Sequence, residues 1–348
     1  MIGDQLYLKH ILDAIKKIEA YVSVGKLVIM KTLYMPKPSI AIATILLLCS
    51  SAAALLLSAC DFMPVSSSST TPTVTELPNP VATLTASSKS PPSTAEQYYE
   101  RGSAYYLWGD YDHALTDFDH AIKLKPDYDK AYHGRGVSYG RKGDIDNAMS
   151  DLTQAIKLNP DYFQAYRDRG FVFHLKGELD FALKDYNKAI ELNPEYPEAY
   201  FQRGLIYSKK KEYDSAIADY TKAIMQQPDY WQVYNNRSYA YNQKGEYALA
   251  ISDSTRCIEL NPRDSGAYGN RAFAYYYVSN YAQAIADATR GIQLGPEYDY
   301  AYYVRGLAYR AKGNHDDARD DFQQVLTLTQ DSELIEKATR ELLALEQN

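Results

Sequence analysis

One set of residues recurs every 34 positions between residues 95 and 332, and this period constrains the fold more than any other feature of the chain. An arginine occupies the same place in seven successive units, at Arg101, Arg135, Arg169, Arg203, Arg237, Arg271 and Arg305. A tyrosine precedes each arginine by three residues, and an alanine and an aspartate recur later, beginning with Ala114 and Asp117. Such a period indicates stacked supersecondary units, each of which buries its apolar face only against its neighbours.

The pattern inside each unit predicts two helices. With each unit numbered from 1, and residue 95 as the first position, positions 4, 8 and 11 have the i, i+4, i+7 spacing of one helix face. Positions 20, 24, 27 and 28 form the same stripe on a second helix. Five units carry glycine at position 15, where a left-handed residue can end the first helix. The sequence therefore predicts an all-α chain of helix-turn-helix units.

These residues resemble the tetratricopeptide repeat, in which position 4 is large, 8 is small, 11 is aromatic, and 20 and 27 are small. The resemblance covers seven units, at 95–128, 129–162, 163–196, 197–230, 231–264, 265–298 and 299–332. It implies a right-handed superhelical solenoid closed by a C-terminal capping helix over 333–348. Ser254 and Ala288 replace the large residue at position 24, so we expect units five and six to pack less tightly there.

Residues that recur in every unit are predicted to serve the architecture. We expect the arginine at position 7 to pair with the aspartate at position 23, because a guanidinium matches a carboxylate in shape and charge. A charged binding ladder is the alternative for these seven pairs. Most of the 34 tyrosines are interpreted as packing residues.

Positions that vary between units are the candidates for recognition. The resemblance implies that positions 2, 5, 9, 12 and 13 line a concave groove, which would be largely apolar and aromatic in this chain. Such a surface suits a peptide or helix with apolar anchors. The alternative is burial of these side chains between neighbouring helices. The candidate groove residues are Tyr99, Tyr106, His133, Arg167, Phe171, His174, Phe201, Leu205, Asn235, Tyr239, Asn242, Phe273, Tyr276 and Tyr303.

Signals of catalysis are absent from the sequence. The chain contains no Gly-rich phosphate loop, His-Glu-x-x-His or Cys-x-x-Cys motif, so we expect no catalytic residue, metal or cofactor. A metal pair of His133 and His174 and an enzyme with an unrecognised site are the alternatives. Cys257 occupies the small position 27 of its unit and is predicted to be a buried thiol. Residues 95–348 carry 30 basic and 39 acidic side chains, which argues against a nucleic-acid partner.

The N-terminal region has the layout of a secretory signal. Residues 39–60 carry no charge, lysines precede them, and small residues end the run. Leu57-Ser58-Ala59-Cys60 resembles the lipobox of bacterial lipoproteins, which implies a lipidated Cys60 on the extracytoplasmic face of a membrane. A signal over 30–59 has an ordinary length, so residues 1–29 are interpreted as an extension from a misassigned start. An uncleaved signal anchor and a cytoplasmic amphipathic helix over 1–29 are the alternatives.

Residues 60–94 are predicted to be a tether. Serine, threonine and proline dominate from residue 64 onward, and only Glu76 and Lys89 are charged there. Such a segment has too little apolar surface to fold by itself. The sequence thus predicts a membrane-anchored, extracytoplasmic scaffold that binds a protein or peptide segment in its groove. A non-catalytic docking subunit of a cell-envelope enzyme or assembly complex is the alternative.

Overall fold

The computed structural model describes residues 91–346, and every regular element in that range is an α-helix. The predicted signal, Cys60 and the tether up to residue 90 lie outside the described residues. The first helices of the seven units are α4 (Ala95–Trp108), α6 (Asp129–Arg141), α8 (Phe163–Leu175), α10 (Pro197–Lys209), α12 (Trp231–Lys244), α14 (Ser265–Tyr277) and α16 (Asp299–Ala311). The second helices are α5 (Tyr111–Leu124), α7 (Ile145–Leu158), α9 (Leu179–Leu192), α11 (Tyr213–Gln226), α13 (Tyr247–Leu260), α15 (Tyr281–Leu294) and α17 (His315–Leu328), and α18 (Ser332–Glu346) follows.

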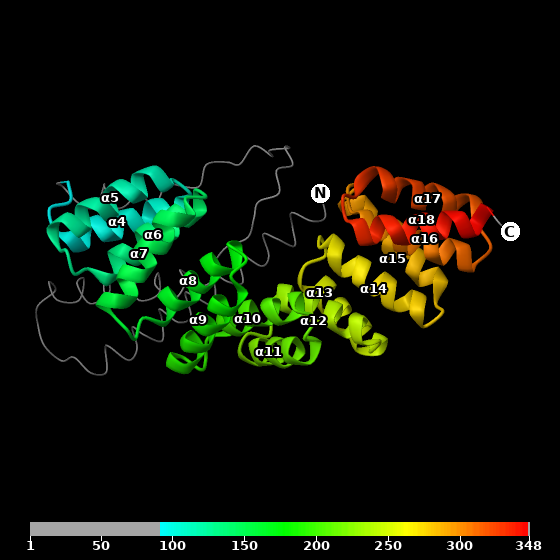
Figure 1. Ribbon diagram of the computed structural model, residues 1–348, viewed down its shortest axis with the longest axis horizontal. Helices are drawn as coiled ribbons and strands as arrows, with labels where there is room; N and C mark the ends of the chain where they lie inside the picture. The colour runs from blue at the N-terminus through cyan, green and yellow to red at the C-terminus, as the bar shows by residue number, and fades with distance from the viewer. Residues whose placement is uncertain (1–90, 347–348) are drawn as a thin grey trace, which may run out of the picture. The chain divides into compact units, whose positions relative to one another are not determined.

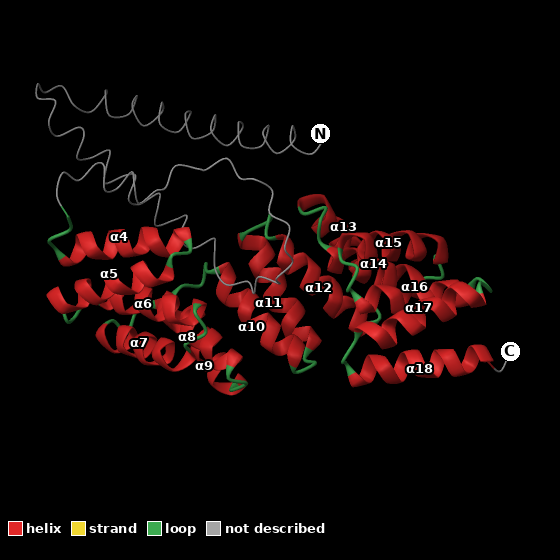
Figure 2. Cartoon of the chain, turned by 90° about the horizontal axis from the view of Figure 1, so that it is seen from above, coloured by secondary structure: helices red, strands yellow, loops and turns green. Residues whose placement is uncertain are grey.

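The two helices of each unit pack against each other, and each second helix also packs against the first helix of the next unit. Figures 1 and 2 show these pairs following one another in chain order from α4 to α18. The predicted all-α solenoid of helix-turn-helix units is thereby confirmed. Within the described range, no helix combines the length and apolarity that a membrane span requires.

Local signals set the ends of the helices. The five glycines at position 15 take φ between 78° and 84°, a left-handed conformation that ends each first helix with little strain. Lys211 and Ser279 hold the same position in units four and six, with φ of 61° and 60°. Asp110 and Asp144 begin second helices by accepting backbone N–H groups with their side chains.

The core of each unit depends on complementary volumes at positions 8 and 24. A Cβ atom at Gly204 would lie 2.6 Å from Cε1 of Tyr220, so glycine makes room for the ring. In unit five the same positions hold Ser238 and Ser254, which are fully buried and joined by a 2.5 Å hydrogen bond. Ala272 and Ala288 of unit six are fully buried too, so the looser packing expected in units five and six does not expose these positions to solvent.

The seven arginines at position 7 pair with the seven aspartates at position 23, as predicted. Arg203 is typical, with Nε 2.7 Å from Oδ2 of Asp219 and Nη2 2.7 Å from Oδ1. In five units the arginine also donates through Nη1 to the second helix of the preceding unit, as Arg203 does to Asn187 at 2.6 Å. Each of these five arginines thus joins three helices, and the role of the seven arginine–aspartate pairs is structural.

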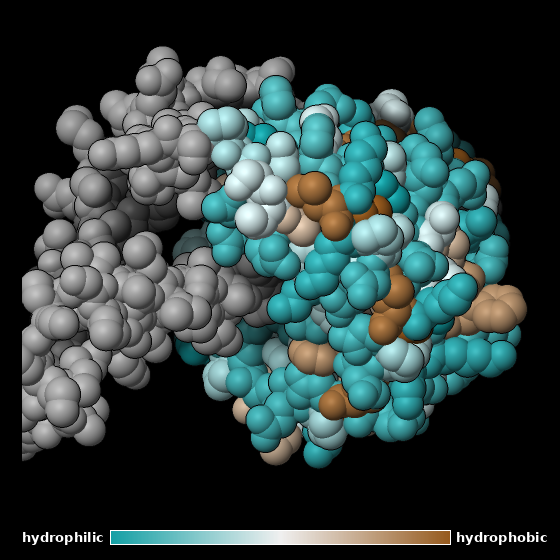
Figure 3. All heavy atoms as spheres, turned by 90° about the vertical axis from the view of Figure 1, so that its left-hand side faces the viewer, coloured by the Kyte–Doolittle hydropathy of each residue, from teal (hydrophilic) through white to brown (hydrophobic). Residues whose placement is uncertain are grey.

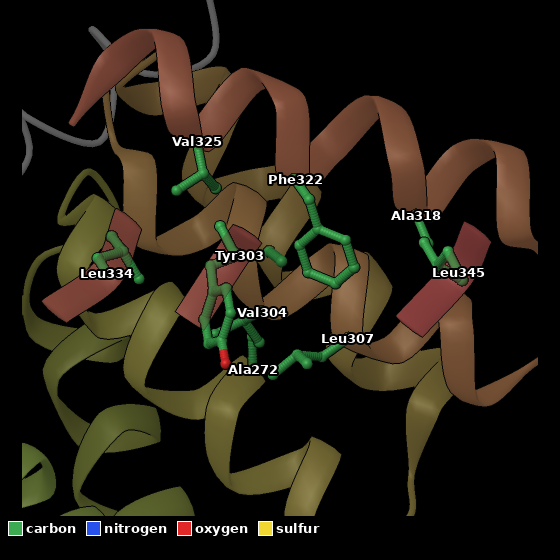
Figure 4. Packing of buried hydrophobic residues seen from close by; sticks show 11 residues of the cluster. Ala272, Tyr303, Val304, Leu307, Ala318, Phe322, Val325, Leu334 and Leu345 are labelled. Carbon is green, nitrogen blue, oxygen red and sulfur yellow. The ribbon is translucent and has the colours of Figure 1, made fainter. Parts of the chain in front are cut away.

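The C-terminal helix α18 packs against α17 and extends the core of unit seven. Its Leu334, Ala338 and Leu345 are buried in one cluster with Tyr303 and Leu307 of α16. Figure 4 shows Leu334 beside Tyr303 and Leu345 beside Ala318. An ion pair between Arg310 and Glu341 further fixes the helix.

Candidate interaction surface

Ten of the fourteen candidate groove residues keep exposed surface. Tyr239 is the most accessible of them, with 40% of its surface exposed. The others are partly exposed, namely Tyr99, Tyr106, His133, Phe171, His174, Leu205, Asn235, Phe273 and Tyr276. A partner could therefore reach side chains from unit one to unit six.

The other four candidates are buried, which corrects the prediction for each. Phe201 is 5% exposed because its ring packs against Tyr220 and Tyr230, at centroid distances of 6.1 and 5.1 Å. Tyr303 is 9% exposed because α18 covers it. Arg167 and Asn242 are each 4% exposed and are held by polar neighbours. None of these four side chains presents a surface that a bound segment could contact directly.

Position 9 supplies the central apolar row of the surface. Leu205, Tyr239 and Phe273 occupy this position in units four, five and six. Tyr239 lies edge-on to Tyr213 at 6.4 Å, and Phe273 lies 5.8 Å from Tyr300. These ring contacts orient Tyr239 and Phe273 before any partner binds.

A largely buried cluster of polar side chains connects units two and three. Nε2 of His133 is 2.6 Å from Oδ2 of Asp168, and the hydroxyl of Tyr162 is 3.1 Å from Nδ1 of His133. Arg167 approaches the other carboxylate oxygen of Asp168 at 3.1 Å, and its guanidinium lies over the ring of Tyr196. Asp168 and Tyr162 are not among the residues predicted from the sequence. Only unit three has an aspartate at position 6, and that exception was the available signal.

The charge of Asp168 follows from its neighbours. Burial raises the pKa of its carboxyl, but Arg167 and the hydrogen bond to His133 outweigh burial and hold that pKa below its usual value. Both ring nitrogens of His133 have partners within the cluster. His133 is thus a positioned core histidine rather than one half of a metal pair with His174.

A second polar cluster joins units five and six. Nδ2 of Asn270 donates to Oδ1 of Asn235 at 2.8 Å, and Nδ2 of Asn242 donates to the carbonyl of Asn270 at 2.8 Å. Asn270 was not among the predicted residues, although it carries most of these bonds. The cluster holds α12 and α14 together.

The described residues contain neither a cluster of metal ligands nor an accessible thiol. Among them, no three histidine, cysteine or acidic side chains gather as a metal site would require. Burial raises the pKa of the Cys257 thiol to about 12, which leaves it neutral and unreactive at ordinary pH.

At the end of the array nearest α4, small separate apolar groups lie among mainly hydrophilic side chains (Figure 3).

The repeated helix pairs and the row at position 9 define a repeat scaffold of the α-solenoid class. Models of the tetratricopeptide repeat match residues 102–143, 141–177 and 172–211, and further such models match 197–230, 232–264 and 270–333. The chain belongs to the tetratricopeptide repeat family. Repeats of this family mediate protein–protein interactions. No curated protein matches the chain.

Solved structures show the same fold. A tetratricopeptide repeat protein from Parabacteroides merdae is 24% identical, with a TM-score of 0.52 over 73% of this chain and 99% of that chain. The Cut9–Hcn1 hetero-tetramer of APC/C contains a chain that is 16% identical, with a TM-score of 0.61 over 76% of this chain and 52% of that one. PilF of Pseudomonas aeruginosa is 20% identical, with a TM-score of 0.54 over 61% of this chain and 97% of its own. At these identities the likeness concerns the fold.

Proposed function

We propose that this chain is a non-catalytic scaffold that holds a protein or peptide segment on the inner face of its first helices. One observation carries the proposal: three apolar side chains, Leu205, Tyr239 and Phe273, repeat at position 9 of consecutive units and keep exposed surface. The residues common to all units are already occupied by packing and ion pairs. Specificity is therefore left to the positions that differ.

The chemistry of this row favours a segment with apolar anchors. Tyrosine and phenylalanine rings held in place by other rings lose little conformational entropy when a partner covers them. Aromatic side chains of this kind contribute strongly to protein interfaces. Partly exposed polar groups nearby, such as His174 and Asn235, can align the main chain of the bound segment.

The structure also limits the path of that segment. Helix α18 covers Tyr303 and Leu307 of unit seven, so these two side chains are closed to a partner. Units one to six remain for the partner, and the row at position 9 lies toward the C-terminal end of this stretch.

The test compares two double variants of the tagged full-length protein in detergent extracts of membranes. Leu205→Ala with Tyr239→Ala removes two anchors of the row. Leu124→Ala with Met225→Ala removes two exposed side chains of second helices and serves as the control. Co-purified proteins are identified by quantitative mass spectrometry, and binding of the purified partner is then titrated. We expect at least a tenfold loss of affinity for the first variant only; equal binding by both would refute the assignment of this face.

We further propose that the scaffold is anchored at the extracytoplasmic face of a membrane by a lipid on Cys60. The support is the Leu-Ser-Ala-Cys sequence at the end of an apolar run, followed by a tether to residue 94. Stable anchoring of this kind requires more than one acyl chain. Mass spectrometry of the protein extracted from membranes should find a modified Cys60 at the mature N-terminus, and Cys60→Ser should leave an unmodified precursor. The same extract would show whether the partner is an enzyme of the cell envelope.

A further inference from the structure

The last helix, α18, covers groove positions of unit seven. Tyr303 and Leu307, at positions 5 and 9 of that unit, are 9% and 5% exposed because they share one apolar cluster with side chains of α18. Figure 4 shows Leu334 of α18 beside Tyr303. Arg310, at position 12, forms an ion pair with Glu341 of the same helix. Helix α18 thus occupies these positions with apolar side chains and one acidic side chain.

The row at position 9 continues beneath this helix. Leu307 holds position 9 of unit seven and is the next member of the row after Phe273 of unit six. Phe273 is itself partly buried against the apolar cluster that contains Leu307. We call Tyr303, Leu307 and Arg310 the α18 site. This site continues the exposed row, but a partner cannot reach it while α18 is in place.

Helix α18 buries little of its own surface. Only three of its 15 residues are buried, whereas α16 buries six of its 13. No further helix follows α18 among residues 91–346, and its Ile335 and Leu343 stay 37% and 53% exposed. Because the hydrophobic contribution grows with the apolar area that is buried, α18 is held less firmly than the helices inside the array.

Local interactions support the helical form of α18 independently of the array. At its start, Asp331 accepts the backbone N–H of Glu333 at 2.8 Å. Lys337 pairs with Glu333 and Arg340 pairs with Glu336, both at 2.6 Å and with i,i+4 spacing. Detachment of α18 from unit seven therefore breaks none of these interactions.

We propose that α18 is a displaceable cover, and that an amphipathic helix of a partner protein takes its place on the α18 site. The chemistry of that helix follows from α18, which is the helix that fits the site. Apolar residues lie at i, i+4 and i+11, and an acidic residue lies at i+7, namely Leu334, Ala338, Leu345 and Glu341. The inference rests on the inner face as the binding surface; it adds unit seven to that surface and names a helix as the partner.

The test uses a fluorescent synthetic peptide of residues 331–346 in place of the partner helix. Leu334→Asp with Leu345→Asp in the full-length chain should detach α18, because docking would bury two carboxylates. Ile335→Asp with Leu343→Asp makes the same changes at exposed positions of the same helix and is the control. Fluorescence anisotropy in detergent should show at least tenfold tighter binding of the peptide to the detached variant than to the control or the wild type. Equal binding to all three would overturn the proposal.

Native hydrogen exchange tests displacement in the wild type and does not depend on a variant. We expect the amides of α18 to exchange at least tenfold faster than those of α16. An excess of the peptide, made with isotope-labelled leucines so that its fragments differ in mass, should raise the exchange of α18 in the chain further. Protection equal to that of α16 and unchanged by the peptide would make α18 a fixed structural cap and overturn the proposal.

A charge exchange identifies the contact with Arg310. A peptide with Glu341→Lys should bind the detached variant severalfold more weakly, and Arg310→Glu in that variant should restore its binding. Adding Leu205→Ala and Tyr239→Ala to the detached variant should leave peptide binding unchanged, so this result is separate from the test of the exposed row. A wild-type dimer that excess peptide dissociates would overturn the assignment to a partner protein, because α18 of a second copy would then be the occupant.

Discussion

The hydroxyl oxygens of Ser238 and Ser254 lie 2.5 Å apart in the buried core of unit five. Unit four places Gly204 against Tyr220 at the same two positions, and in both units the paired residues are buried. The volume of the residue at position 8 therefore determines how large the residue at position 24 of the facing helix can be. Even a small change in the volume of one residue of the pair should therefore lower the stability of the unit.

Gly204→Ala tests this match of volumes. The added Cβ would lie 2.6 Å from Tyr220, so the ring or the helix must move. Overpacking of this kind costs about 1–3 kcal/mol, despite the higher helix propensity of alanine. Urea unfolding followed by circular dichroism measures the change. The control, Ala272→Gly in unit six, should cost about 1 kcal/mol through helix propensity; a Gly204→Ala protein as stable as the wild type would contradict the argument.

Asp253→Ala tests the ion pair between the helices of a unit. It leaves Arg237 only partly exposed and without a carboxylate, after the loss of contacts at 2.7 and 2.9 Å. We expect a loss on the order of a few kcal/mol in the free energy of unfolding. Asp214→Ala removes an exposed ion pair with Lys244 and should cost much less, because water screens exposed charges. Similar losses of unfolding free energy for the two variants would show that the partly buried pair stabilises the protein no more than an exposed pair does.

Asp168→Ala should be among the most damaging single changes in the array. It removes a carboxylate from beside the buried Arg167 and removes the hydrogen bond to His133, for a loss of about 3–5 kcal/mol in the free energy of unfolding. Replacing both residues of the pair, with Arg167→Leu and Asp168→Leu, leaves no buried charge and should cost less than the single change. A larger loss for the double variant would contradict this reasoning.

The same carboxyl predicts a dependence of stability on acid. Because the pKa of Asp168 is lower in the folded state, its contribution is present above its unfolded pKa of about 3.9 and is lost as the pH falls below that value. Asp168→Asn should therefore flatten the decline in thermal stability between about pH 5 and pH 3. An unchanged acid profile would mean that other carboxylates govern it.

Cys257 should resist alkylation in the native protein. Its side chain is fully buried, and burial raises the pKa of the thiol to about 12, so almost no thiolate exists at pH 8. We expect iodoacetamide to label its peptide only after denaturation, as judged by mass spectrometry. Rapid labelling of the native protein at pH 8 would show that unit five opens readily.

The sequence by itself determined the repeating part of this protein. Helix stripes, glycine turns and the pairing of Arg203 with Asp219 depend on residues of one unit, and seven copies display the same requirement. Local spacing and side-chain chemistry are enough to predict such features, because each unit meets the same neighbours. The family resemblance added the places where the varying residues would lie.

Only the tertiary structure decided which varying side chains remain accessible. Phe201 and Tyr239 both stand on first helices and are both aromatic, yet the rings of Tyr220 and Tyr230 bury Phe201 while Tyr239 stays exposed. Tyr303 is buried because α18 packs over it. The exposure of a side chain depends on which residues pack over it in three dimensions, such as those of the C-terminal helix over Tyr303. The spacing of residues along the chain does not specify this cover, because the side chains that bury a residue come from other segments and reach it only through tertiary packing.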